Sequence, residues 1–202
     1  MGSLENFNFA KFPRLIETGT GEGLSVHFAL NNGATEVHTV EECPAVFLTA
    51  WIHFRKNRAV HLNRGRSVDF LRKLDNFENA IIFLDAHFAG GADYSKTTFA
   101  QSVTHPDSFP LIEELEILLS KDISNAVIII DDARIYYEDC PSKCPELLRQ
   151  WDKLPQLEST LDKFTGHTRH LLGDEQGYVV LMPNGTELSE IYMPLKVEPQ
   201  SQ

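Results

Sequence analysis

The most informative turn in the chain reads Glu17-Thr18-Gly19-Thr20-Gly21-Glu22-Gly23. It follows a short apolar segment, residues 14–17, and precedes a segment with helical character that begins at Leu24. Glycines in a strand–helix turn let the backbone bend sharply and approach a bound ligand closely. Several classes of nucleotide-binding enzyme have a similar pattern, so the glycines alone predict a ligand site without naming the ligand.

A second acidic residue strengthens this interpretation. Glu41 ends the next predicted strand, 36–41, and lies 24 residues after Glu17. A carboxylate there can accept hydrogen bonds from both ribose hydroxyls of an adenosine cofactor. Surface charges at two strand ends are the alternative, but the joint spacing favours a cofactor site. We expect the backbone amides of the three glycines to face the same crevice as Glu41, in a site formed by Glu17, Gly19, Thr20, Gly21, Gly23 and Glu41.

Along the rest of the chain, apolar runs alternate with amphipathic segments, which is typical of a parallel sheet covered by helices. Two late segments, 168–172 and 177–182, flank Gly-Asp-Glu-Gln and indicate an antiparallel hairpin. Residues 88–108 fit either a lid over the site or an insertion without regular structure. The other predicted strands are 59–62, 80–84 and 126–130, and the predicted helices are 24–31, 44–56, 67–74, 111–120 and about 145–151.

Together these features resemble the class I methyltransferases, which depend on S-adenosylmethionine (SAM). The resemblance covers about residues 13–183. It implies a doubly wound α/β fold with a mostly parallel seven-stranded sheet, whose last strand is inserted antiparallel in a C-terminal hairpin. It also implies that the glycine turn packs against the methionyl part of SAM and that Glu41 holds the ribose. We expect one domain over residues 1–202, with a frayed tail from about residue 195.

The sequence departs from this family after the third predicted strand. Related enzymes often have Gly-Asp-Ser there, with the aspartate near the adenine amine, whereas this chain has Gly65-Arg66-Ser67. A guanidinium cannot accept a hydrogen bond from an amine. The adenine would therefore depend on backbone groups, on Ser67 or on stacking.

Two further segments follow neighbouring predicted strands. They read Leu-Asp-Ala-His-Phe-Ala-Gly-Gly from Leu84 and Ile-Asp-Asp-Ala-Arg from Ile130, and with the Phe-Pro-Leu-Ile-Glu-Glu-Leu segment from Phe109 they resemble a bacterial methyltransferase-like subgroup of largely undefined substrate. Ligands of open α/β sheets bind outside the carboxyl ends of the strands. We therefore expect a cluster at the reacting end of the cofactor that consists of Asp85, His87, Asp131 and Asp132, with Asp85 also touching SAM.

Three roles for this cluster are open. His87 could be a general base whose ring a carboxylate orients, which would make Asp85, His87 and Asp131 the catalytic residues. Alternatively, the four residues could bind Mg²⁺, as in some SAM-dependent O-methyltransferases, with His87 favouring Mn²⁺, Fe²⁺ or Zn²⁺. The third role is a polar network that only stabilises the strand ends.

Composition limits the partners. The formal net charge of −11 over 202 residues argues against nucleic acid. No run approaches the roughly 18 apolar residues that a membrane span requires, and three cysteines without a signal peptide indicate a cytoplasmic protein.

We expect a SAM-dependent methyltransferase acting on a small molecule, at a sugar or metabolite hydroxyl, with a homodimer left open. A nicotinamide-dinucleotide-dependent oxidoreductase and a noncatalytic SAM-binding module are the alternatives.

Overall fold

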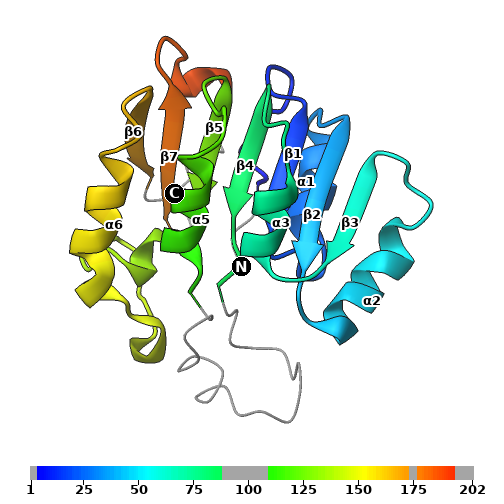
Figure 1. Ribbon diagram of the computed structural model, residues 1–202, viewed down its shortest axis with the longest axis horizontal. Coiled ribbons are helices and arrows are strands. Elements are labelled where there is room, and N and C mark those ends of the chain that lie inside the picture. The colour runs from blue at the N-terminus through cyan, green and yellow to red at the C-terminus, as the bar shows by residue number, and fades with distance from the viewer. Residues whose placement is uncertain (1–3, 88–108, 173–176, 194–202) are drawn as a thin grey trace, which may run out of the picture.

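The computed structural model describes residues 4–87, 109–172 and 177–193. Within these ranges, seven strands form one sheet in the order β3-β2-β1-β4-β5-β7-β6 (Figure 1). Three segments lie outside the described residues: 88–108, for which a lid and an insertion were both open, the hairpin loop 173–176, and the tail from residue 195. The strands are β1 (Arg14–Thr18), β2 (Glu36–Glu41), β3 (Val60–Arg64), β4 (Ala80–Leu84), β5 (Ala126–Ile130), β6 (His167–Leu172) and β7 (Tyr178–Pro183). The α-helices are α1 (Leu24–Asn31), α2 (Pro44–Phe54), α3 (Ser67–Lys73), α5 (Leu111–Leu118) and α6 (Leu154–Leu161).

The sheet is parallel from β3 to β5, and β7 runs antiparallel to both β5 and β6. This confirms the expected mostly parallel, seven-stranded sheet with an antiparallel C-terminal strand. The two central strands β4 and β5 read Ala-Ile-Ile-Phe-Leu and Ala-Val-Ile-Ile-Ile, and every residue in them is buried. Continuous apolar runs of this kind are typical of parallel strands that helices cover on both faces.

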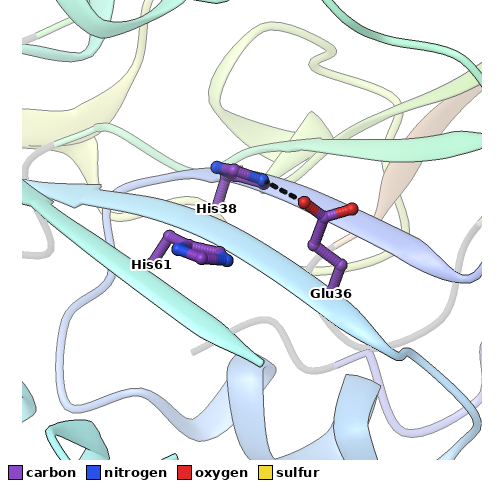
Figure 2. A group of neighbouring side chains, drawn as sticks. All are labelled: Glu36, His38 and His61. Atoms are coloured by element: carbon purple, nitrogen blue, oxygen red, sulfur yellow. Dashed lines mark hydrogen bonds and ion pairs between the residues drawn. The ribbon is translucent and has the colours of Figure 1, made fainter. Parts of the chain in front are cut away.

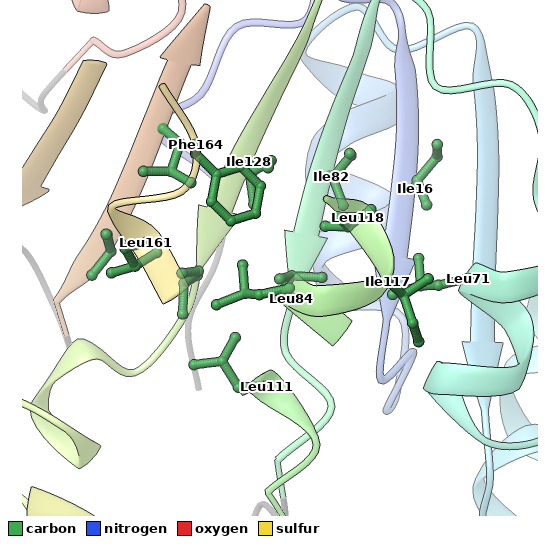
Figure 3. Packing of buried hydrophobic residues seen from close by; sticks show 14 of the residues in the cluster. Ile16, Leu71, Ile82, Leu84, Leu111, Ile117, Leu118, Ile128, Leu161 and Phe164 are labelled. Carbon is green, nitrogen blue, oxygen red and sulfur yellow. The ribbon is translucent and has the colours of Figure 1, made fainter. Parts of the chain in front are cut away.

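Two apolar cores lie on opposite faces of the sheet. One joins α3, α5 and α6 to the strands, and Figure 3 labels Leu118 of α5 and Ile82 of β4 among its members. The other joins α1 and α2 to the opposite face, together with Phe7 near the N-terminus and Ile191 near the C-terminus. The packed core thus extends beyond residues 13–183, the range that the resemblance covers. No helix within the described ranges is long and apolar enough to cross a membrane.

The predicted elements differ from the structure mainly in two regions, residues 145–161 and the end of β3. The helix expected at about 145–151 is wrong, since the chain there forms two short 3₁₀ helices, Glu146–Leu148 and Trp151–Lys153. The regular helix is α6, which was not predicted although Leu157 and Leu161 have helical spacing and are both buried. Strand β3 continues to Arg64 rather than ending at residue 62, because it pairs with β2 through polar residues that carry no apolar signal.

Candidate active site

The glycine turn lies over the carboxyl end of β2. The amides of Gly19 and Thr20 both donate to the Val40 carbonyl, at 3.0 Å. Gly19 has a φ of +82°, and a Cβ there would lie 2.4 Å from the carbonyl oxygen of Asp85. Gly21 also has a positive φ, +54°, but a Cβ there would meet no atom within 4 Å. Gly19 is therefore required by packing, whereas Gly21 borders open space that a ligand can enter.

Of the three glycine amides expected to face the same crevice as Glu41, only that of Gly21 does so. The Gly19 amide is bonded to Val40, the Gly23 amide donates to the Thr20 carbonyl at 2.9 Å, and the Gly21 amide donates to Glu41 Oε2 at 3.0 Å. The turn closes against β2, and backbone donors inside a folded chain rarely remain without an acceptor. The same contact places the Glu41 carboxylate directly beside the turn, as the sequence predicted.

Glu41 is fixed from both sides. Besides Gly21, the amide of Cys43 donates to Glu41 Oε1 at 2.8 Å. Burial raises the pKa of Glu41, and the two backbone hydrogen bonds act in the opposite direction. A carboxylate offers about four acceptor positions, so each oxygen can accept one more hydrogen bond. A partly buried, pre-oriented carboxylate of this kind suits a pair of neighbouring hydroxyl groups.

Glu17 and Thr20 lie behind the turn. The Glu17 carboxyl is fully buried and accepts hydrogen bonds from the hydroxyls of Ser25 in α1 and Thr39 in β2, the latter at 2.6 Å. The Thr20 hydroxyl is 2.6 Å from that of Thr39. Burial raises the pKa of Glu17 to about 7. These buried side chains therefore link the turn to α1 and β2.

The structure brings together the acidic cluster that the sequence predicted. Asp85 and His87 follow β4, and Asp131 and Asp132 follow the adjacent parallel strand β5. His87 Nε2 lies 2.7 Å from Asp132 Oδ2, and His87 Nδ1 lies 3.3 Å from Asp85 Oδ1. Arg134 Nε in turn lies 2.9 Å from Asp132 Oδ1. Asp132 has a positive φ of +54°, a strained conformation for this residue that often occurs at functional sites.

Protons in the cluster are unevenly distributed. Burial, together with the charge of Asp131, raises the pKa of Asp85 well above its usual range. Burial also raises the pKa of Asp131 to about 6, and its Oδ1 is buried without a hydrogen-bond partner among the described residues. Burial lowers the pKa of His87, but its hydrogen bond and charge interaction with Asp132 outweigh burial, so that pKa is raised overall. The cluster thus combines two carboxyl groups with raised pKa values, Asp85 and Asp131, with a histidine whose Nε2 is held by Asp132.

One buried acid, Glu114 of α5, was not predicted from the sequence. Its side chain is 1% exposed, and its Oε1 has no hydrogen-bond partner among the described residues. Burial raises the pKa of Glu114 to about 7, while the hydroxyls of Ser67 and Thr18 lower it. Ser67, a candidate for holding adenine, therefore turns its hydroxyl toward Glu114. The helical spacing of Leu111, Glu114 and Leu118 places Glu114 on the buried face, which was the signal for it.

A small cavity connects this acid to the cluster. Its polar lining consists of His87, Glu114, Asp131 and Tyr136. Buried carboxyl oxygens without partners are rare in folded proteins, because their desolvation is not compensated. Among the described residues two carboxyl oxygens of this kind occur, and both belong to residues that line this cavity, Glu114 and Asp131.

Comparison with known proteins identifies the architecture. The sequence matches no protein-family model and no curated protein sequence. The fold resembles an S-adenosylhomocysteine (SAH)-bound methyltransferase, PaMTH1, from Podospora anserina, with a TM-score of 0.61 and 16% identity over 85% of this chain and 71% of that one. For an O-methyltransferase from Bacillus cereus in complex with SAH, the TM-score is 0.54 and the identity 17%, over 84% of this chain and 74% of that one. For a methyltransferase from Geobacter sulfurreducens, the TM-score is 0.54 and the identity 15%, over 85% of this chain and 70% of that one.

The chain has the class I methyltransferase-like fold. In this fold the carboxyl ends of β1 and β2 carry the glycine turn and Glu41, and those of β4 and β5 carry the Asp–His cluster. The close approach of Gly19 to the Asp85 backbone joins the two groups. Of the four residues proposed as metal ligands, Asp85, His87 and Asp131 place one ligand atom each within 4.8 Å of one another. Asp132 instead pairs with His87 and Arg134.

The buried acid of this methyltransferase-like fold predicts a pH-dependent stability. The pKa of Glu114 rises from 4.5 to about 7 on folding, so the folded protein binds more protons than the unfolded chain between these values. Stability from this group is therefore present at low pH and lost as the pH rises through about 7. Glu114→Gln should remove a stability loss of roughly 3 kcal/mol between pH 5 and 8. Urea unfolding of the variant and the unmodified protein at both pH values measures this difference in the free energy of unfolding.

Glu116 provides the matched control for this experiment, because it lies on the same helix but is exposed. Glu116→Gln should show the same decline in stability with pH as the unmodified protein. If Glu114→Gln declines equally, the Glu114 carboxyl does not hold a proton in the folded state.

Proposed function

We propose that the protein is a SAM-dependent methyltransferase that methylates a hydroxyl group of a small molecule, such as a sugar or another metabolite. One observation carries this proposal. The open side of Gly21 and the fixed Glu41 carboxylate lie beside each other, at the carboxyl end of the parallel strands. The Asp85–His87–Asp131 cluster lies at the same end. A site for an adenosine cofactor and a site for proton-transfer chemistry are thus adjacent.

The residues at this end of the sheet fit the ribose end of SAM. Glu41 would accept hydrogen bonds from the two ribose hydroxyls, and the cofactor would lie over Gly21. When bound, SAM supplies a methyl carbon that the sulfonium has already activated. The chain has to align the acceptor with that carbon, exclude water and accept a proton. On the adenine side, Arg66 replaces the expected acid, and Ser67 turns to Glu114, so backbone groups or stacking would hold the base.

The Asp–His cluster would serve the acceptor. The contact between His87 Nδ1 and Asp85 is long, at 3.3 Å, so an acceptor hydroxyl could replace Asp85 there. It would give its proton to the neutral form of the imidazole, which has to be populated for the step to occur. Asp132, at 2.7 Å from Nε2, would then stabilise the imidazolium, and Arg134 would hold Asp132 in place. Asp85 and Asp131 would orient the acceptor.

A metal-assisted version remains the second candidate. It is favoured by the ligand atoms of Asp85, His87 and Asp131, which lie within 4.8 Å of one another, and by the unpartnered Asp131 oxygen. Carboxylate and imidazole groups together suit Mn²⁺, Fe²⁺ or Zn²⁺ better than Mg²⁺. Such an ion would position and acidify the acceptor hydroxyl.

An oxidoreductase and a noncatalytic binding module both fit the molecule less well. A nicotinamide-dependent oxidoreductase is expected to have a parallel sixth strand, whereas β7 is antiparallel to β5. Two of the solved structures with this fold contain SAH. A noncatalytic SAM-binding module would not require buried, unpartnered carboxyl oxygens beside the cofactor site.

Calorimetry with SAH and NADH tests the proposal first. We expect SAH to bind and NADH not to bind; the opposite result would favour the oxidoreductase. SAH release from SAM is then measured with a panel of hydroxylated sugars and metabolites, with and without EDTA. Turnover that EDTA leaves unchanged excludes the metal, and His87→Ala and Asp131→Ala should reduce turnover while SAH affinity is retained. Unchanged turnover in both variants would remove the cluster from the mechanism.

A further inference from the structure

A second group of metal-ligating side chains lies away from the candidate active site, on the outer strands β2 and β3 of the sheet. It consists of Glu36 and His38 on β2 and His61 on β3. The parallel register pairs His38 directly with His61, and Glu36 lies two residues before His38 on the same face of β2. Three donor groups from two strands therefore converge on one surface, as Figure 2 shows.

The geometry of this edge cluster is close to that of a metal site. His38 Nε2 lies 2.8 Å from Glu36 Oε1, and the two imidazole rings stack with centroids 4.7 Å apart. The donor atoms of all three residues lie within 4.8 Å of one another. Neighbouring ligands of a tetrahedral Zn²⁺ are separated by about 3.3 Å, given bonds of about 2.0–2.1 Å. Side-chain rotations can close this difference, since His61 is exposed and the other two are half-buried.

Arg14 of β1 supports the carboxylate from behind. Its Nε lies 2.8 Å from Glu36 Oε2, so the other oxygen of Glu36, Oε1, remains directed toward the histidines. Partners of this kind orient metal ligands in many proteins. The cluster is also separate from the cofactor site, because His38 precedes Glu41 by three residues, or about 10 Å along the strand.

We propose that Glu36, His38 and His61 form a binding site for a divalent transition-metal ion, with Zn²⁺ as the preferred ion. Two imidazoles and one carboxylate suit Zn²⁺, Ni²⁺ or Cu²⁺ and do not suit Mg²⁺ or Ca²⁺. Three protein ligands leave a fourth position open to water. Because β3 is the edge strand of the sheet, the bound ion ties it to β2 and stabilises this edge.

Thermal unfolding in the presence of metal ions tests this site. Zn²⁺ at about 100 times its Kd should raise the Tm by roughly 5–10 °C, whereas Mg²⁺ should have no effect through this cluster. His61→Ala should weaken Zn²⁺ binding at least tenfold, as measured by calorimetry near neutral pH, and His38→Ala should do the same. His61 is exposed, so its replacement should leave the fold intact, which circular dichroism verifies.

Two controls separate this site from other sources of zinc binding. His53→Ala removes an exposed histidine of α2 outside the cluster, and His87→Ala removes the histidine of the candidate active site. Both variants should retain the zinc binding that His61→Ala weakens. In the NMR spectrum of the unmodified protein, Zn²⁺ should shift the imidazole resonances of His38 and His61. If His61→Ala binds Zn²⁺ with unchanged stoichiometry and affinity, or if Zn²⁺ leaves both resonances in place, the proposal is wrong. Neither result bears on SAM binding.

Discussion

Glu41→Gln should weaken SAH binding on the order of 100-fold. The Glu41 carboxylate is held by the amides of Gly21 and Cys43, with acceptor capacity left on both oxygens. A hydrogen bond to a charged group contributes about 1.5–3 kcal/mol, so the loss of the charged acceptor for two ribose hydroxyls should cost about 3 kcal/mol. Glutamine keeps the size of the side chain but replaces one acceptor oxygen by a donor. Calorimetric titration with SAH measures the change.

The neighbouring Glu42 gives a matched control, since it carries the same charge but is exposed. Glu42→Gln should bind SAH as tightly as the unmodified protein. The new amide group of Glu41→Gln would face the backbone donors of Gly21 and Cys43, so its folding has to be checked. Circular dichroism and thermal unfolding provide this check. A folded Glu41→Gln variant with unchanged SAH affinity would contradict the proposed ribose contact and, with it, the orientation of the cofactor.

Gly19→Ala should destabilise the protein by roughly 3–5 kcal/mol. An added Cβ would lie 2.4 Å from the backbone carbonyl oxygen of Asp85, and this backbone is tied by the amide of Asp85 to the Thr18 carbonyl at 3.1 Å. The positive φ of +82° adds about 1–2 kcal/mol of strain for a residue with a Cβ. Losses of this size are exceptional for a single substitution and are a large part of the stability of an ordinary domain. Urea unfolding measures the loss.

Gly21→Ala separates the two causes. Gly21 also has a positive φ, but its Cβ would meet no atom within 4 Å, so only the strain of about 1–2 kcal/mol applies. The added methyl group should instead hinder SAH binding, because it enters the open space beside Glu41. Equal losses of stability in the two variants would show that the contact with Asp85 does not constrain the turn.

Most of the elements and the general location of the candidate site were predictable from local sequence patterns. The apolar runs of β4 and β5 predict buried parallel strands, and the polar residues that end β2, β4 and β5 meet at one edge because parallel strands share a direction. Element boundaries could not be located where the apolar signal was weak. The strand β3 carries His61, Asn63 and Arg64, so its end could not be found from hydrophobicity.

The sequence by itself determined the type of fold and the residues that meet at the sheet edge, because periodicity and turn chemistry are local properties of the chain. Only the tertiary structure decided how those residues are used. It assigns Glu17 to a buried role and the Gly21 amide to Glu41, and it adds Glu114 to the cavity. The same is true of His38 and His61, which lie far apart in the sequence. They become neighbours through the register between β2 and β3, and register depends on the packing of the whole sheet.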